Sequence, residues 1–176
     1  MVDESLKTTN PPEYRKQFLE DVLDENGMSP IAKACFMARM DQETGGFRYM
    51  YELGSPSYFT KYDGRQDLGN SQPGDGYNFR GRGYIQLTGR GNYTRYGPAV
   101  GVDLVNNPDL AADEAVAARV ALTYWYNVKV QGTTLAQWAE QGNINNVILG
   151  INGGMNGAQE TINKYKMYAN KYGVII

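Results

Sequence analysis

The stretch that decides the fold runs from Met40 to Tyr93. It begins M-D-Q-E-T-G-G-F-R-Y-M-Y-E-L-G (40–54) and, after a connection rich in tyrosine and glycine, ends F-R-G-R-G-Y-I-Q-L-T-G-R-G-N-Y (79–93). Two acidic residues, Glu43 and Glu52, stand in an aromatic setting, and a short polar segment punctuated by glycines follows them. A site that cleaves carbohydrates uses paired carboxyl groups, aromatic rings and hydrogen-bonding side chains. The stretch therefore predicts a site of this kind.

The two glutamates differ in their predicted surroundings. Glycoside hydrolysis uses one carboxyl group held neutral, to protonate the leaving oxygen, and a second held ionised, to activate water or attack the sugar. Glu43 directly follows the apolar run Ile31–Met40, which predicts a buried helix, whereas Glu52 lies nine residues further on, beyond two glycines. Because burial favours the neutral carboxyl, we assign Glu43 as the candidate acid and Glu52 as the candidate base.

The acidic residues also admit ordinary structural roles. Most glutamates are solvated surface charges. What singles out Glu43 is its position at the end of an apolar helix, just before a Gly-Gly pair where a helix should stop. Asp63, Asp67 and Asp75 are rivals to Glu52 as the base, although Asp63 and Asp75 each precede a glycine in what is ordinarily a turn.

Four motifs give the chain a family resemblance. They are Q-E-T-G-G-F (42–47), G-R-G-Y-I-Q-L-T-G-R-G-N-Y (81–93), Y-G-P-A-V-G-V-D-L-V-N-N-P-D-L (96–110) and I-N-G-G-M-N-G (151–157). Together they resemble glycoside hydrolase family 19, which holds plant and bacterial chitinases and the endolysins of tailed bacteriophages. The resemblance implies a mainly α, lysozyme-like fold of two lobes around a cleft: a large helical lobe, and a small lobe of loops and a short hairpin over about residues 44–96.

The resemblance also implies roles for single residues. Glu43 falls on the family's general acid and Glu52 on its general base, while Thr88 falls on the hydroxyl that helps to hold the attacking water. Gln86, Asn92 and Asn152 fall on polar residues that bind the sugar, and Tyr84 is a further candidate substrate-binding residue. The family inverts the anomeric carbon, so no covalent intermediate is expected.

The chain departs from the family pattern at two positions. Relatives usually carry a histidine before the acid, whereas this chain has Gln42 and no histidine at all. Relatives also place an arginine of the carboxylate network in the last helix, where this chain has Thr161. The resemblance therefore leaves the pKa of the acid open.

Length and composition favour one catalytic domain over residues 1–176, without a separate wall-binding domain. The single cysteine, Cys35, lies inside the apolar helix and is expected to be a small buried hydrophobe. We find no group of residues with the spacing of a metal site and expect no cofactor.

Charge and hydropathy exclude two classes of partner. The net charge is −2 without long runs of one sign, which argues against a nucleic-acid groove, and no segment has the length of a membrane span. The first residues lack the pattern of a signal peptide. We therefore expect a protein that is made in the bacterial cytoplasm, and we also expect it to be a monomer.

The helix patterns place the remaining elements. Pro11 and Pro12 open a helix that Gly27 closes, and Ser29 with Pro30 starts the helix that ends at Glu43. Further helices are predicted over 111–126, 134–140, 143–149 and 158–172. A short hairpin is predicted between residues 78–80 and 84–86.

The function that these inferences favour is a phage endolysin. It would hydrolyse the β-1,4 bond between N-acetylmuramic acid and N-acetylglucosamine in peptidoglycan, acting in the periplasm after a separate pore-forming protein releases it. Three alternatives remain: a chitinase using the same residues, a lytic transglycosylase that needs one glutamate, and a non-catalytic wall-binding module.

Overall fold

The structure, a computed structural model, describes residues 10–176. Residues 1–9, counted within the single domain and searched for a signal peptide, lie outside the described part. The described chain is mainly α-helical, as expected. Its elements in order are α1 (Pro12–Glu25), α2 (Pro30–Glu43), α3 (Pro56–Phe59), the 3-10 helices η2 (Thr60–Tyr62) and η3 (Gln66–Leu68), α4 (Asp75–Asn78), α5 (Arg90–Val100), the 3-10 helix η4 (Pro108–Ala112), α6 (Glu114–Asn127), β1 (Lys129–Val130), β2 (Thr133–Thr134), α7 (Leu135–Glu140), α8 (Ile144–Asn152) and α9 (Ala158–Lys171).

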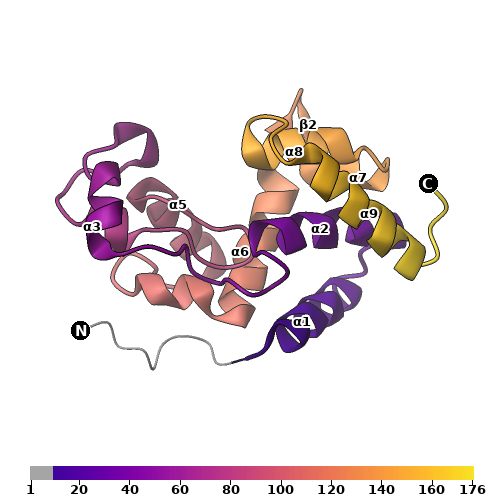
Figure 1. Cartoon of the computed structure of the whole chain (residues 1–176), viewed down its shortest axis with the longest axis horizontal. Helices are drawn as coiled ribbons and strands as arrows, with labels where there is room; N and C mark the ends of the chain where they lie inside the picture. The colour runs from indigo at the N-terminus through magenta and orange to yellow at the C-terminus, as the bar shows by residue number, and fades with distance from the viewer. Residues whose placement is uncertain (1–9) are drawn as a thin grey trace.

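Figure 1 shows these elements gathered in two lobes that α6 connects. Helices α2, α7, α8 and α9 lie together in one lobe, and α3, α4 and α5 lie in the other. The contacts agree with this arrangement, because α9 and α7 pack on α2 while α5 packs on α6. The chain passes from one lobe to the other directly after α2, so the end of α2 lies where the lobes meet.

Helix α2 forms for local reasons that the sequence shows. Ser29 is its N-cap, accepting a hydrogen bond from the Ala32 N–H at 3.3 Å, and Pro30 occupies the first turn. Every residue from Ala32 to Met40 is buried, so α2 is enclosed on all sides, which is the environment expected of a helix that is apolar all round. The predicted start and end of this helix are confirmed.

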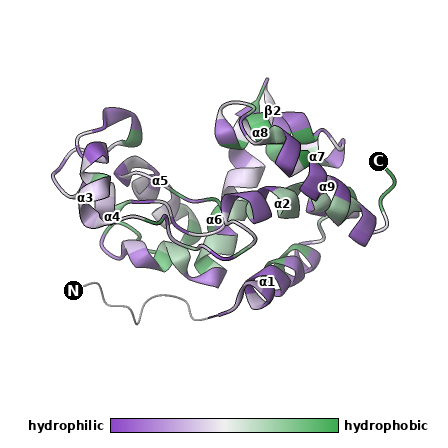
Figure 2. Cartoon of the chain, viewed as in Figure 1, coloured by the Kyte–Doolittle hydropathy of each residue, from purple (hydrophilic) through white to green (hydrophobic). Residues whose placement is uncertain are grey.

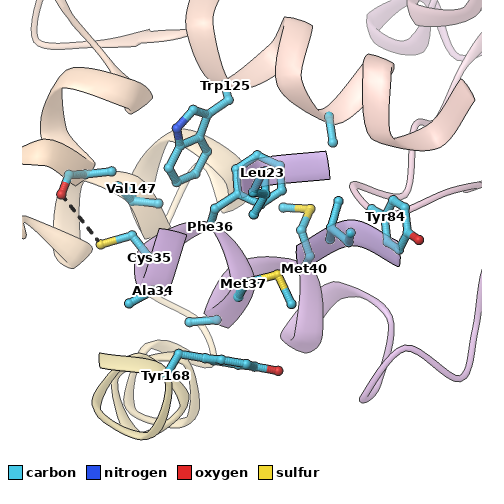
Figure 3. Close-up of a cluster of buried hydrophobic side chains, with 14 of the residues drawn as sticks. Leu23, Ala34, Cys35, Phe36, Met37, Met40, Tyr84, Trp125, Val147 and Tyr168 are labelled. Atoms are coloured by element: carbon cyan, nitrogen blue, oxygen red, sulfur yellow. Dashed lines mark hydrogen bonds between the residues drawn. The ribbon is translucent and has the colours of Figure 1, made fainter. Parts of the chain in front are cut away.

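The main core surrounds α2 (Figure 3). Phe36 meets the Trp125 ring of α6 edge-on, with ring centroids 4.8 Å apart, and Leu23 of α1 lies beside them. Cys35 is fully buried, with its Sγ 4.0 Å from the carbonyl oxygen of Ala139, as the expectation of a small buried hydrophobe requires. A second cluster of buried side chains lies between α5 and α6, and α6 contributes to both clusters.

Helix α1 covers this core from one side. Leu19 and Leu23 are fully buried, whereas Tyr14, in the first turn of α1, is about half exposed. The outer face of α1 is hydrophilic (Figure 2). Among residues 10–176, no helix combines the length and apolar character needed to cross a membrane.

The predicted hairpin between residues 78–80 and 84–86 is wrong. Arg82 instead makes isolated antiparallel bridges with Tyr51 and Leu87. The reason is the buried Arg82 guanidinium, which donates to the carbonyl oxygens of Asn78 and Arg80 at 2.8 and 3.3 Å. These carbonyl oxygens are therefore not free to accept the backbone hydrogen bonds of a hairpin. The two-stranded sheet lies elsewhere, where Lys129 pairs with Thr134.

Two predicted helix boundaries also change. The helix expected from residue 111 begins at Glu114, because the Asp113 carboxylate caps it by accepting from two N–H groups at 3.1 Å each. Helix α8 continues through Gly150, where a Cβ would come within 2.4 Å of Leu135 Cδ2, so this glycine permits close packing and does not end the helix. Asn152 is therefore the last residue of α8.

Candidate active site

Glu43 is the last residue of α2, and the chain turns sharply after it. The Thr44 hydroxyl donates to the Met40 carbonyl at 2.6 Å and accepts from the Phe47 N–H at 2.9 Å, which closes the helix end. Gly45 and Gly46 have φ values of 58° and 79°, in the left-handed region that favours glycine. Glu43 thus lies at the end of α2, where the lobes meet, and 21% of its side chain is exposed.

The Glu43 carboxyl forms an ion pair with Arg39, one helical turn earlier, whose side chain is completely buried. The same guanidinium donates to Asn152 Oδ1 at 2.8 Å and to Thr161 Oγ1 at 2.9 Å. Burial raises the pKa of the Glu43 carboxyl above its ordinary value, although the positive charge of Arg39 opposes this shift. A carboxyl with a raised pKa can carry a proton and donate it.

Glu52 is held differently. Its backbone N–H donates to the Gly81 carbonyl at 2.8 Å, and its Oε2 accepts from the Gly81 N–H at 3.1 Å. The residue is half-buried and forms no ion pair among the described residues. A carboxylate that accepts a backbone hydrogen bond and also meets solvent is suited to receive a proton from water.

The polar segment after Gly81 converges on Glu52. A Cβ built on Gly81 would lie 2.9 Å from Gln86 Oε1 and 3.3 Å from Glu52 Oε2, so both side chains border this glycine. Gln86 has a φ of 53°, and its Nε2 donates to the Gly83 carbonyl at 2.9 Å. The Thr88 hydroxyl donates to the Gln86 carbonyl at 2.8 Å. The structure therefore brings three of the predicted site residues together.

The two asparagines extend these groups. Asn92, exposed in the first turn of α5, donates from Nδ2 to the Thr88 carbonyl at 2.8 Å. Asn152 is exposed at the end of α8, where its Oδ1 accepts from Arg39 and its Nδ2 donates to the Asn156 carbonyl at 3.0 Å. Asn92 thus belongs with the Glu52 group and Asn152 with the Glu43 group.

Tyr84, expected among the substrate-binding residues, is in the core. Its side chain is 0% exposed, its ring meets Phe47 edge-on, and its hydroxyl donates to the Arg15 carbonyl at 3.0 Å. A fully buried ring presents no surface to a ligand, so this assignment is corrected. The role of Tyr84 is to anchor the segment that carries Gln86 to the core.

The three aspartates considered as rivals to Glu52 have other partners. Asp63 accepts from two backbone N–H groups at the start of α4, those of Gly74 and Gly76, at 2.9 and 2.8 Å. Asp75 is buried and forms an ion pair with Arg90, and Asp67 pairs with Arg65 at the surface. The structural interpretation of Asp63 and Asp75 is therefore confirmed.

The structure accounts for the positions that depart from the family pattern. Gln42 does not hold the acid; its Nε2 donates to the Glu160 carboxylate at 2.8 Å. Thr161 is fully buried and accepts a hydrogen bond from Arg39. Sequence reasoning missed Arg39, although a charged residue inside an apolar run, four residues before Glu43, was a signal that could have identified it.

The residues described include no group of three histidine, cysteine or acidic side chains arranged to hold a metal ion. Two pockets of about 410 and 290 Å³ lie away from both glutamates. The larger is lined by α5 and the loop after it, and the smaller by α3 and α4. Asp63, considered as a rival to Glu52, lines the smaller pocket, but neither pocket is lined by Glu43, Glu52 or the predicted substrate-binding residues.

Comparison with known proteins gives matches over most of the chain. The model of the chitinase class I family, glycoside hydrolase family 19, matches residues 32–138. A glycosyl hydrolase family 19 domain-containing protein of Haemophilus influenzae is 27% identical over 167 residues, covering 79% of each chain. Endochitinase 1 of Theobroma cacao is 28% identical over 195 residues, covering 97% of this chain but only 58% of the cacao protein.

A solved structure agrees with these matches. Chitinase C from Streptomyces griseus superposes with a TM-score of 0.71 at 31% identity, covering 90% of this chain and 84% of that one. The family match over residues 32–138 includes Glu43, Glu52, Gln86 and Thr88, whereas Asn152 lies beyond it.

Proposed function

The chain belongs to glycoside hydrolase family 19, the chitinase class I family, and on that premise we propose that it cleaves the β-1,4 bond between N-acetylmuramic acid and N-acetylglucosamine in peptidoglycan. The fold is the mainly α-helical, lysozyme-like fold of that family, and the chain is a glycoside hydrolase. One observation carries the assignment of the acid and the base. Glu43 has a pKa raised by burial at a helix end, while Glu52 is half-buried and held by a backbone N–H.

The proposed reaction divides two proton transfers between these residues. Glu43 gives its proton to the glycosidic oxygen as the bond to the anomeric carbon breaks. Glu52 takes a proton from a water molecule, which attacks that carbon from the opposite face and inverts it. Gln86 borders Glu52 at Gly81, and the Thr88 hydroxyl bonds to the Gln86 carbonyl; we propose that this amide and this hydroxyl hold the water. Asn152 and Asn92 are proposed to bind the sugars on either side.

Two exposed side chains support peptidoglycan as the polymer. The turn between the glutamates carries Arg48 and Tyr49, both of them exposed. A tyrosine ring can stack on a sugar face, and an arginine can pair with carboxylates. The peptide attached to muramic acid carries free carboxylates, as does a muramic acid without its peptide, whereas chitin carries none. We propose that Arg48 meets one of these groups.

The biological setting proposed is that of an endolysin. Residues 1–176 would act as one monomeric catalytic unit that is made in the host cytoplasm and reaches the periplasmic wall after a separate pore-forming protein opens the membrane. The single buried cysteine fits a protein made in a reducing compartment.

The deciding experiment is mass spectrometry of the fragments released from purified Gram-negative peptidoglycan. The parent should release fragments with reducing-end muramic acid. Glu43→Gln and Glu52→Gln should each lower the rate by at least ~10²-fold, because general acid and base groups contribute about 10²–10⁴. Glu160→Gln, which removes an exposed carboxylate near Glu43, serves as the control and should match the parent.

Three further outcomes would change the assignment. Activity of Glu43→Gln within about threefold of the parent would exclude this residue as the acid, since the loss would fall far short of that range. Anhydro ends together with an active Glu52→Gln variant would indicate a lytic transglycosylase. Binding to the wall without any cleavage would indicate a non-catalytic module.

A chitinase is the second candidate, and the relatives favour it. The cacao protein is named an endochitinase, and the Streptomyces structure is a chitinase. The same carboxyl groups would act on a polymer of N-acetylglucosamine alone. Cleavage of chitin oligomers without release of peptidoglycan fragments would decide for it, and Arg48→Ala should then leave the rate unchanged.

A further inference from the structure

Arg39 is a buried cation at the junction of three helices. It belongs to α2, its side chain is 0% exposed, and it contacts Glu43 of the same helix, Asn152 of α8 and Thr161 of α9. Asn152 and Thr161 lie 113 and 122 residues further along the chain. Burying a charge is costly unless partners compensate for it, so this arrangement calls for a reason beyond packing.

We propose that Arg39 is the positioning residue of the acid. The family resemblance led us to expect a cation at position 161 of the last helix, and Arg39 supplies that cation from α2 instead. In this role it orients the Glu43 carboxyl relative to Asn152 and stabilises the carboxylate that remains after proton transfer. The inference rests on the proposed function, because it takes Glu43 as the proton donor.

The geometry supports this role in two ways. The planar guanidinium holds several acceptors at fixed angles, so one side chain sets the relative positions of the Glu43 carboxyl and the Asn152 amide. When Glu43 gives up its proton, a negative charge develops at a largely buried helix end. A permanent cation already in contact with that carboxyl stabilises the charge without reorganisation.

Within the described chain, the Arg39 guanidinium also carries one unpaired donor. Its Nε is buried and has no hydrogen-bond partner among the described residues. Buried donors are normally paired, and an unpaired one lowers stability.

The other charged groups nearby have partners of their own. Asp41 accepts from Lys164 and from the Tyr168 hydroxyl of α9. Glu160 accepts from Gln42. From α6, Tyr124 approaches the pair as a neutral phenol with a pKa raised by burial, and its hydroxyl donates to a backbone carbonyl of α8. Arg39 is therefore the cation that acts on Glu43.

The test compares Arg39→Gln, Arg39→Lys and the double variant Arg39→Gln/Thr161→Arg on the polymer that the parent cleaves. Arg39→Gln should lower kcat by about 10²-fold, the low end of what an acid contributes, with little change in KM. Loss of the cation should raise the pKa of Glu43, so the basic limb of the pH–kcat profile should move to higher pH. The double variant should recover most of kcat and return the limb toward the parental position.

Arg39→Lys keeps the positive charge but lacks the planar guanidinium, so its kcat should fall between those of the parent and Arg39→Gln. The basic limb of its pH–kcat profile should stay near the parental position. Lys33→Met is the matched control, because Lys33 is also a buried cation of α2 but pairs with Asp24 on α1. It should lower stability and leave both kcat and the limb unchanged.

A second readout does not depend on activity. The Glu43 carboxyl carbon can be titrated by NMR in protein labelled at glutamate, with Glu43→Gln identifying the signal. Its pKa should rise in Arg39→Gln and fall again in the double variant. Circular dichroism establishes that each variant is folded, and if Arg39→Gln is not, the Lys and double variants carry the test.

The outcomes separate the two proposals. The role of Arg39 is overturned if the folded variants keep the parental kcat, the parental pH–kcat profile and the parental NMR titration while Glu43→Gln is inactive. The proposed function would then still stand. A folded double variant that recovers neither kcat nor the titration also overturns the role of Arg39. A fully active Glu43→Gln instead overturns the proposed function.

Discussion

At the scale of single residues, one strained backbone position borders Glu52. Gln86 is not a glycine but has a φ of 53°, a conformation that costs a side chain roughly 1–2 kcal/mol. Its amide is held by the Gly83 carbonyl and its Oε1 lies near the Gly81 Cα, at the border of Glu52. The strain thus directs a hydrogen-bonding side chain to the place where the attacking water is proposed to lie.

Gln86→Gly should separate stability from activity. Glycine adopts this φ freely, so the free energy of unfolding should stay the same or rise by up to about 1 kcal/mol, while kcat/KM should fall by at least about tenfold with the amide lost. Gln131, with a φ of 52° in the turn between β1 and β2, provides the control. Gln131→Gly should have a similar effect on urea unfolding but none on turnover. A Gln86→Gly variant with parental turnover would contradict the role given to this residue.

At the scale of elements, an ion pair joins the short helix α4 to α5. Asp75 is 1% exposed and accepts two hydrogen bonds from Arg90, at 2.9 and 2.6 Å, and two from backbone N–H groups. The Arg90 guanidinium holds the pKa of the Asp75 carboxyl below its ordinary value of 3.8. This pair anchors α4 beside the start of α5, which carries Asn92.

Asp75→Asn should destabilise the protein by about 2–4 kcal/mol at pH 7, because it leaves a partly buried arginine without its counter-charge. A lowered folded-state pKa contributes stability that is present above the ordinary value of 3.8 and is lost as the pH falls through the lower folded value. The difference in unfolding free energy between parent and variant should therefore shrink below pH 4, as measured by urea unfolding. Asp67→Asn, at an exposed pair, should scarcely matter. A difference that stays constant with pH would argue against the ion pair as its source.

At the scale of the whole molecule, α6 connects the two buried clusters. Ala117, Ala121 and Trp125 face the cluster around α2, while Val116 and Val120 face the one against α5. Because one rigid helix contributes to both clusters, a defect in either is expected to weaken the other. Glu43 and Glu52 would then keep their relative positions as long as the whole fold is intact.

Cys35 provides a probe of this coupling. The thiol is 0% exposed and burial raises its pKa to about 12, so native protein should not react with a thiol reagent at pH 8. Val120 lies in the cluster against α5. Val120→Ala should lower the free energy of unfolding, measured by Cys35 labelling in urea, by about 1–2 kcal/mol, because apolar burial is lost and a cavity is left. Met167→Ala, at an exposed site of α9, is the control. Labelling that Val120→Ala leaves unchanged while circular dichroism shifts would mean that the lobes unfold separately.

The sequence by itself determined the helix that carries Glu43, its cap at Ser29 and Pro30, and its end at the Gly-Gly pair. Each of these depends on contacts between residues a few positions apart, which residue types and their spacing express directly. The family motifs likewise selected Glu52 and Gln86, which the fold brings together at Gly81, and Thr88, whose hydroxyl bonds to the Gln86 carbonyl.

Only the tertiary structure decided the role of Arg39, the burial of Tyr84 and the failure of the hairpin at residues 78–80. Arg39 meets Thr161 across 122 residues of sequence, and Tyr84 bonds to a carbonyl 69 residues away. Arg82 occupies the carbonyls that the hairpin would have used. Local pattern cannot specify which distant group satisfies a buried polar atom, because that depends on how the helices pack in three dimensions.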